Sequence, residues 1–254
     1  MTPATRDEWM TVTAARMLWD RCVCFVGIGL PSEACNLARL THAPDIVLIY
    51  ESGTIGTRPD VLPLSIGDGE LAATATCVVS LPDIFAHYLQ AGRAEEADVD
   101  APHTRLPGAG GAPEIASHAR QTFVMLKASP RSFVERLDFR TSAGYLDGHG
   151  ARARSGVRGG GPRAVITDFG VLTPHPQTNE LQLSGLFADA SVDDARAAVG
   201  WSLALSDHIE ALAAPTALEL DTLRALKART HEAHQQPVQL PAWTATDPGT
   251  PEHP

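Results

Sequence analysis

The chain has 254 residues, which is enough for one large α/β domain or two small ones with a sizeable buried core. Its hydrophobic content of 44% is ordinary for a globular protein, and its net charge of -10 argues against a nucleic-acid-binding protein, which would carry a basic surface. The longest apolar stretch is far shorter than the ~20 residues of a membrane-spanning helix, and the N-terminus lacks the basic start of a signal peptide. We therefore expect a cytoplasmic protein that binds neither nucleic acid nor membranes.

The N-terminal region predicts a capped helix followed by a strand–turn–helix unit. Thr5, with Glu8 three residues later, forms the capping-box pattern of a helix start. Residues 22–26 read as a short strand, and residues 27–29 form a glycine turn into a helix with Pro31 in its first turn. This turn is one glycine short of a dinucleotide-binding fingerprint, so a structural tight turn is favoured over a phosphate-binding loop.

The apolar run at 46–50 predicts a buried strand that ends directly at Glu51. A glycine-punctuated turn follows at 52–56. A carboxylate at the end of a buried strand is held at the edge where open α/β sheets bind their ligands. Judged on this stretch alone, Glu51 as a solvent-facing strand cap is the commoner alternative.

The rest of the chain alternates strands with helices. We predict strands at 76–80, 122–126 and 165–169, an edge strand at 181–183, and helices at 82–90, 113–120, 192–200 and 217–229. The glycine run at 159–161 is interpreted as a flexible lead into its strand. This alternation predicts an α/β fold with an open, mainly parallel sheet flanked by helices. We expect one domain over 1–232 and a proline-rich, disordered tail over 233–254.

A second glycine-rich segment precedes the helix expected at 113. It contains Gly108, Gly110 and Gly111 and ends at Ala112. Glycines let backbone N–H groups approach a ligand closely and adopt positive φ angles. A plain turn before the helix explains the same pattern equally well.

The cysteine and histidine spacing favours free thiols over disulfides or zinc. Cys22, Cys24, Cys35 and Cys77 show no Cys-x-x-Cys pair, which is typical of reduced thiols in a cytoplasmic protein. The ten histidines are scattered, and the pair at 231 and 234 is one residue short of zinc-protease spacing. We expect no metal site.

Several of these motifs occur in an order that resembles the β subunit of family I CoA-transferases, of the glutaconate and 3-oxoacid (3-oxoadipate) type. The matching segments are 25–31, 50–56, 62–67, 105–114, 133–139 and 164–172, and the resemblance covers about residues 10–230. It implies the CoA-transferase fold, with 1–232 as its β-subunit domain. It also implies an α-subunit partner, together with acyl-CoA and carboxylic-acid substrates, so that coenzyme A is a substrate and no cofactor is needed.

The resemblance also implies roles for particular residues. Glu51 matches the family's covalent nucleophile, which carries CoA as a glutamyl thioester. Gly108, Gly110, Gly111 and Ala112 match a loop that lies against the CoA-bearing site, as binding or oxyanion-stabilising residues. The function implied is CoA transfer between an acyl-CoA and a 3-oxo or dicarboxylic acid.

One departure from the family pattern lies at residues 94–104, where the family carries a longer segment with an apolar strand. Here the segment is short and acidic, so we expect a solvent-exposed loop instead of a buried strand. This difference keeps open an alternative function, a catalytically impaired subunit that serves in structure or assembly. A CoA-thioester hydrolase on the same fold is less favoured because Glu51 is present.

Overall fold

The computed structural model describes residues 2–89, 110–137 and 140–235. Gly108, the 94–104 segment and the tail from residue 236 therefore lie outside the described residues. Within the described part of the chain, no helix is both long and apolar enough to cross a membrane.

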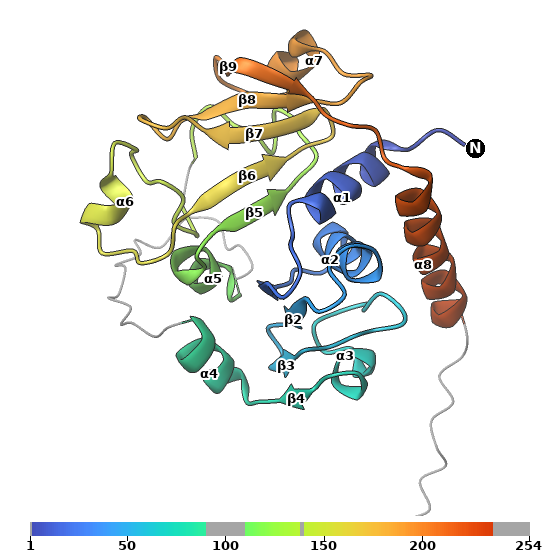
Figure 1. Cartoon of the computed structure of the whole chain (residues 1–254). Coiled ribbons are helices and arrows are strands. Elements are labelled where there is room, and N and C mark those ends of the chain that lie inside the picture. Colours follow the sequence, from blue (N-terminus) through green and yellow to red (C-terminus); the bar gives the residue numbers. More distant parts are fainter. Residues whose placement is uncertain (1, 90–109, 138–139, 236–254) are drawn as a thin grey trace, which may run out of the picture.

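Two sheets form the frame of the molecule, with helices α1 (Arg6–Arg16) and α2 (Leu30–Leu40) between them (Figure 1). The first sheet has the order β1 (Val23–Phe25), β2 (Val47–Ile49), β3 (Thr54–Ile55) and β4 (Cys77–Val78). The second sheet has the order β5 (Thr122–Met125), β6 (Pro162–Ile166), β7 (Gly170–Pro174), β8 (Leu181–Leu186) and β9 (Ala204–Ala211).

The predicted α/β class, with open sheets flanked by helices, is confirmed. The sheets are mixed, however, whereas a mainly parallel sheet was predicted. The pairs β1–β2, β5–β6 and β8–β9 are parallel, whereas β2–β3, β3–β4, β6–β7 and β7–β8 are antiparallel. Parallel neighbours need a long crossover, but β2–β3 and β6–β7 are joined by tight turns. The strand predicted at 181–183 is β8, which lies between β7 and β9 and is not an edge strand. Strands β3, β7 and β9 were not predicted.

The remaining helices are α3 (Gly69–Ala73), α4 (Leu81–Asp83) with the π-helical η1 (Ile84–Leu89), α5 (Ala112–His118), α6 (Ala151–Arg154), α7 (Val192–Ala197) and α8 (Ala217–Gln235). The helices predicted at 82–90, 113–120, 192–200 and 217–229 are thus present. Helix α8 continues to Gln235, past the domain boundary expected at residue 232. The capping box at the start of α1 is also confirmed, because Thr5 and Glu8 each bond the other's backbone N–H.

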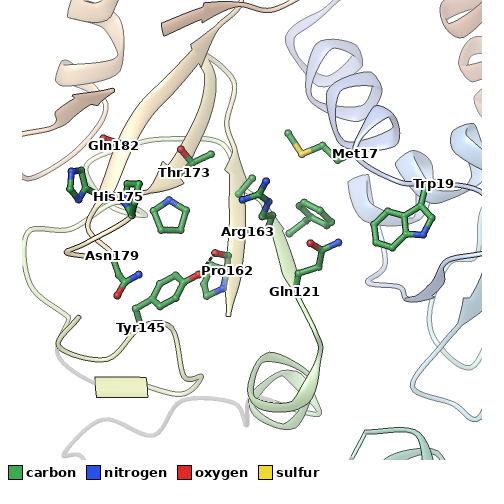
Figure 2. Close-up of a pocket in the computed structure, with 14 residues that line it drawn as sticks. Met17, Trp19, Gln121, Tyr145, Pro162, Arg163, Thr173, His175, Asn179 and Gln182 are labelled. Atoms are coloured by element: carbon green, nitrogen blue, oxygen red, sulfur yellow. Dashed lines mark hydrogen bonds between the residues drawn. The ribbon is translucent and has the colours of Figure 1, made fainter. Parts of the chain in front are cut away.

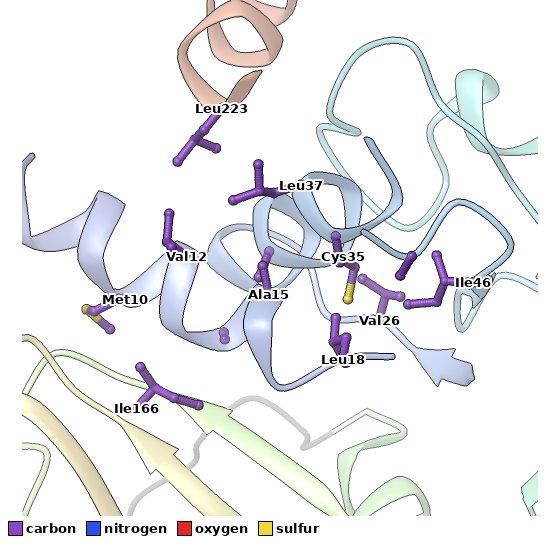
Figure 3. Packing of buried hydrophobic residues seen from close by; sticks show 14 of the residues in the cluster. Met10, Val12, Ala15, Leu18, Val26, Cys35, Leu37, Ile46, Ile166 and Leu223 are labelled. Atoms are coloured by element: carbon purple, nitrogen blue, oxygen red, sulfur yellow. The ribbon is translucent and has the colours of Figure 1, made fainter. Parts of the chain in front are cut away.

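Strand β2 is buried on both faces, which fixes the residues that follow it. Leu48 belongs to the main core, which also contains residues of α1 and α2. Figure 3 shows this core with Ile166 of β6 and Leu223 of α8. Its neighbour Ile49 points to the opposite face and packs with Ile55 and Ile84. Because successive side chains of a strand alternate between faces, a doubly covered strand reads as the continuous apolar run seen at 46–50.

Helix α8 packs over α1 and α2 through an apolar stripe and charged contacts. Leu220, Leu223 and Leu226 are buried in the stripe. Arg224 Nε donates to Glu8 Oε1 at 2.7 Å, and the Glu8 residue is 7% exposed. This hydrogen bond from Arg224 is the main reason why the pKa of Glu8 lies below its ordinary value.

We predict that the Glu8–Arg224 pair stabilises the fold at neutral pH and less in acid. A carboxyl whose pKa is lowered by folding contributes stability above its unfolded pKa, and that contribution is lost as the pH falls through the lowered value. Arg224→Met should therefore lower the free energy of unfolding at pH 7 and lower it less at pH 3, as measured by urea denaturation.

Arg196→Met is the matched control, because Arg196 pairs with Asp193 at 3.8 Å and their side chains are 53% and 94% exposed. Exposed pairs of this kind contribute little to stability. Equal effects of the two substitutions at pH 7, or an Arg224→Met effect that does not depend on pH, would contradict the prediction.

Candidate active site

Glu51 lies at the tip of the hairpin that joins β2 to β3. Strand β2 ends at Ile49, and a tight turn is closed by a hydrogen bond from the Gly53 N–H to the Tyr50 carbonyl at 3.0 Å. Tyr50 N–H donates in turn to the Thr54 carbonyl at 3.1 Å. The buried strand predicted at 46–50 is thus present as β2, which ends two residues before Glu51, and Glu51 is partly exposed at the turn.

Contacts with α2 and with the residue after β4 hold the turn in place. The Tyr50 side chain is fully buried, and its hydroxyl lies 2.8 Å from Ser32 Oγ of α2. Burial raises the pKa of Tyr50 to about 12, so the phenol stays protonated and can donate. Gly53 has a φ of +95°, and a Cβ there would lie 2.1 Å from the Val79 carbonyl oxygen. A glycine is thus required for the turn to lie against the end of β4.

The glycine-rich segment meets Glu51 across the molecule. Gly111 N–H donates to Glu51 Oε1 at 2.9 Å, and the two residues are 60 positions apart in the sequence. Gly111 caps the start of α5, and the preceding Gly110 has a left-handed φ of +60°. A Cβ on Gly111 would lie 2.9 Å from Glu51 Oε1 and 2.5 Å from Phe85 Cζ. The absence of a side chain at Gly111 therefore permits the hydrogen bond.

Of the residues expected at the site, the structure brings Glu51, Gly110 and Gly111 together. Ala112 follows as the first residue of α5. Gly108 lies outside the described residues. Within the described part of the chain, no other group bonds the second carboxylate oxygen of Glu51, Oε2.

Two nearby residues were not singled out from the sequence. Phe85 of η1 forms a wall beside Gly111, and its ring centroid lies 6.3 Å from that of Phe25. A helix was predicted there, but a π-helical segment shifts the phase of its side chains, so their directions could not be inferred. Ser52 Oγ is buried and has no hydrogen-bond partner among the described residues. It leaves an unused polar group beside Glu51, for which the sequence offers no signal beyond adjacency.

A separate hollow of about 750 Å³ lies at the second sheet (Figure 2). Residues that line it include Trp19, Tyr145, Arg163 and His175, and none of its lining residues belongs to the hairpin or to the glycine segment. The hollow is therefore distinct from the candidate site at Glu51. Its volume does not by itself indicate a reaction or a ligand. Among the described residues, no cluster of three or more His, Cys, Asp or Glu side chains could hold a metal.

The arrangement around Glu51 suits a carboxylate that changes its charge during a reaction. Oε1 is oriented by a backbone N–H, while Oε2 remains open to attack another group. A backbone donor held at an oxygen stabilises negative charge that develops there, and such donors are among the strongest contributors to catalysis. The geometry thus fits nucleophilic chemistry by Glu51.

Comparison with known proteins identifies the family. The family model described as coenzyme A transferase matches residues 8–97 and 96–197. The chain is 46% identical to the B subunit of the 3-oxoadipate CoA-transferase of Pseudomonas knackmussii, over 93% of this chain and 98% of that protein. It is 30% identical to the B subunit of the glutaconate CoA-transferase of Acidaminococcus fermentans, over 87% of this chain and 91% of that protein.

Solved structures agree on the fold. The glutaconate coenzyme A-transferase of Acidaminococcus fermentans matches with a TM-score of 0.78 and 28% identity, covering 93% of this chain and 99% of that chain. The decarboxylase AibA/AibB matches with a TM-score of 0.71, covering 91% of this chain and 98% of that chain, but at 21% identity this likeness concerns the fold alone. Since one fold carries both named activities, the chain's sequence relatives decide between them. The chain belongs to the coenzyme A transferase family and is a CoA-transferase subunit of the B type.

Proposed function

We propose that this subunit moves CoA between an acyl-CoA and a 3-oxo or dicarboxylic acid of the 3-oxoadipate kind, through a glutamyl-CoA thioester on Glu51. The observation that carries the proposal is the Gly111 N–H held 2.9 Å from Glu51 Oε1 at the tip of a buried hairpin. The 3-oxoadipate CoA-transferase relative at 46% identity supports the choice of acid. Coenzyme A enters as a substrate, and the proposal needs no further cofactor.

In the first step, Glu51 Oε2 attacks the thioester carbonyl carbon of the donor. An O–C bond forms and the C–S bond breaks, which leaves an acyl-glutamyl anhydride and CoA thiolate. The thiolate then attacks Glu51 Cδ and displaces the donor acid as a carboxylate, which takes Oε2 with it. Glu51 now carries CoA as a thioester, and the energy of the thioester bond is retained on the protein.

The acceptor acid reverses these steps. Its carboxylate attacks Glu51 Cδ and releases CoA thiolate, and the thiolate attacks the acyl carbon of the new anhydride. The products are the acceptor's CoA thioester and a free Glu51 carboxylate with one oxygen supplied by the acceptor. Whenever Cδ is attacked, negative charge develops on Oε1, where Gly111 N–H is already placed to donate.

We predict that incubating the complete assembly with acyl-CoA, followed by borohydride reduction, leaves a mass change on the peptide that contains Glu51. Borohydride reduces a glutamyl thioester, whereas it leaves an ordinary carboxylate intact. Glu51→Gln should abolish both the mass change and turnover. Glu210→Gln is the matched control, because Glu210 is exposed on β9, and it should behave like the wild type.

The outcomes separate the proposal from its alternatives. CoA transfer with an unmodified Glu51 would contradict the mechanism. No transfer in a correctly assembled complex would favour the impaired structural or assembly subunit suggested by the short 94–104 segment. Release of free CoA without acyl transfer would favour a thioester hydrolase.

We also propose that an α subunit of the A type completes the site, because both relatives are B subunits of CoA-transferases. Among the described strands, β4 lies at an edge of the first sheet, and Val79, the residue after β4, contacts the Glu51 turn at Gly53. Val78 of β4 is 57% exposed and Leu81 of α4 is 51% exposed. An edge strand with uncovered apolar side chains is a surface suited to association.

A cytoplasmic location is included in this proposal, and the free cysteines fit it.

We predict that Leu81→Asp weakens assembly with the α subunit without unfolding the chain, because an acidic residue is favourable in the first turn of a helix. Leu218→Asp is the matched control, since Leu218 is 68% exposed in the first turn of α8. Analytical ultracentrifugation of the mixed subunits should show a dissociation constant at least about tenfold higher for Leu81→Asp. Equal affinities for the two variants would place the partner on another surface. Without an α subunit, the chain should show no CoA-transferase activity.

A further inference from the structure

Arg152 of α6 is a buried arginine that pairs with no carboxylate among the described residues. It is 5% exposed, and burial is the main cause that lowers its pKa. Its guanidinium donates only to backbone carbonyl oxygens within the described part of the chain. The acceptors are those of Gly159 at 2.7 Å, Ala143 at 3.0 Å, Gly144 at 2.8 Å, Ala116 at 2.8 Å and Ser117 at 3.2 Å. Burying a charge is costly, and these acceptors compensate for the water that it loses.

The five carbonyl acceptors of Arg152 belong to three separate segments of the chain. Ala116 and Ser117 lie in the last turn of α5, where helix carbonyls have no partner within the helix. Gly159 belongs to the segment before β6, and Ala143 and Gly144 belong to an earlier loop. One planar guanidinium with donors in a fixed fork thus joins the C-terminal end of α5 to two loops.

The contacts that join the C-terminal end of α5 to Arg152 and the two loops are here called the α5 joint. The glycine run at 159–161 is part of this joint and is packed against α5, so it is not merely the flexible lead that was predicted. Gly159 N–H donates to the Ser117 carbonyl at 2.7 Å. A Cβ on Gly159 would lie 2.4 Å from the Ala119 carbonyl oxygen, and one on Gly160 would lie 2.2 Å from that of Arg120. These glycines let the segment pack against the end of α5.

The other end of α5 is the one that reaches Glu51. Gly111 caps the helix and is tied to it by the hydrogen bond from Ile115 N–H to the Gly111 carbonyl at 3.0 Å. A helix of this length spans about 10 Å, so a tilt of about 10° at its far end moves Gly111 by roughly 2 Å. Such a movement would break the 2.9 Å contact with Glu51.

We propose that Arg152 is a positioning residue for the reaction at Glu51. It holds the C-terminal end of α5, and thereby keeps the Gly111 N–H directed at Glu51 Oε1. This inference rests on the proposed function, because it assigns catalytic importance to that hydrogen bond.

The test compares Arg152→Lys with Arg224→Met in the complete assembly, at a temperature where both are folded. Lysine keeps the charge but cannot present the fork to five carbonyl oxygens. We expect Arg152→Lys to lower kcat and the rate of borohydride-trappable adduct formation on Glu51 by about 10- to 100-fold. The KM for acyl-CoA should change little, because the contact that Arg152 would position is made by the Gly111 N–H to Glu51 Oε1. Arg224→Met removes an ion pair remote from the site and should leave kcat unchanged.

Gly159→Ala disturbs the α5 joint at the glycine run instead of at Arg152. It therefore tests the same inference if Arg152→Lys does not fold. It should also lower kcat, and both variants should speed amide hydrogen exchange in the peptide that covers 110–118. Wild-type kcat with faster exchange would show that Arg152 only stabilises the fold. Wild-type exchange would show that α5 is held by other contacts, and either result overturns the inference. A wild-type assembly without trappable Glu51 would instead refute the proposed function, while the exchange measurement would still test the joint.

Discussion

The hydrogen bond from Gly111 N–H to Glu51 Oε1 is the contact on which the site depends. It joins a hairpin of the first sheet to the helix that leads into the second sheet. Each partner needs a glycine to reach this position: a Cβ on Gly53 would meet the carbonyl oxygen of Val79, the residue after β4, and a Cβ on Gly111 would meet the ring of Phe85. The contact therefore requires that both halves of the fold be correctly placed.

The surrounding structure restrains each side of this contact separately. On the hairpin side, both faces of β2 are buried, and the Tyr50 hydroxyl contacts Ser32 of α2. On the helix side, Arg152 and the glycine run hold the far end of α5. Precision of this kind matters for acyl transfer, because an error of about 1 Å in the position of a reacting group can lower the rate about 100-fold.

The sequence predicted the local features of the site and missed those created by distant contacts. The apolar run at 46–50 indicated a buried strand ending at Glu51, because a doubly covered strand leaves a continuous apolar pattern. Strand β3, with two residues, is too short to show any period, and β9 (Ala204–Ala211) is largely exposed and polar. Arg152 was overlooked because arginines are usually exposed. The contact between Glu51 and Gly111 spans 60 positions and has no local signature; only the family resemblance pointed to both residues.

The most direct test is the rate at which a Gly111→Ala variant forms the Glu51–CoA thioester in a single turnover, compared with Gly69→Ala. A Cβ on Gly111 would lie 2.9 Å from Glu51 Oε1, whereas one on Gly69 would meet no atom within 4 Å. Losing one well-placed donor lowers catalysis by about 100-fold or more. We therefore expect a loss of about that size for Gly111→Ala and wild-type rates for Gly69→Ala. Equal rates in folded assemblies of the two variants would show that the Gly111–Glu51 contact has no part in the reaction.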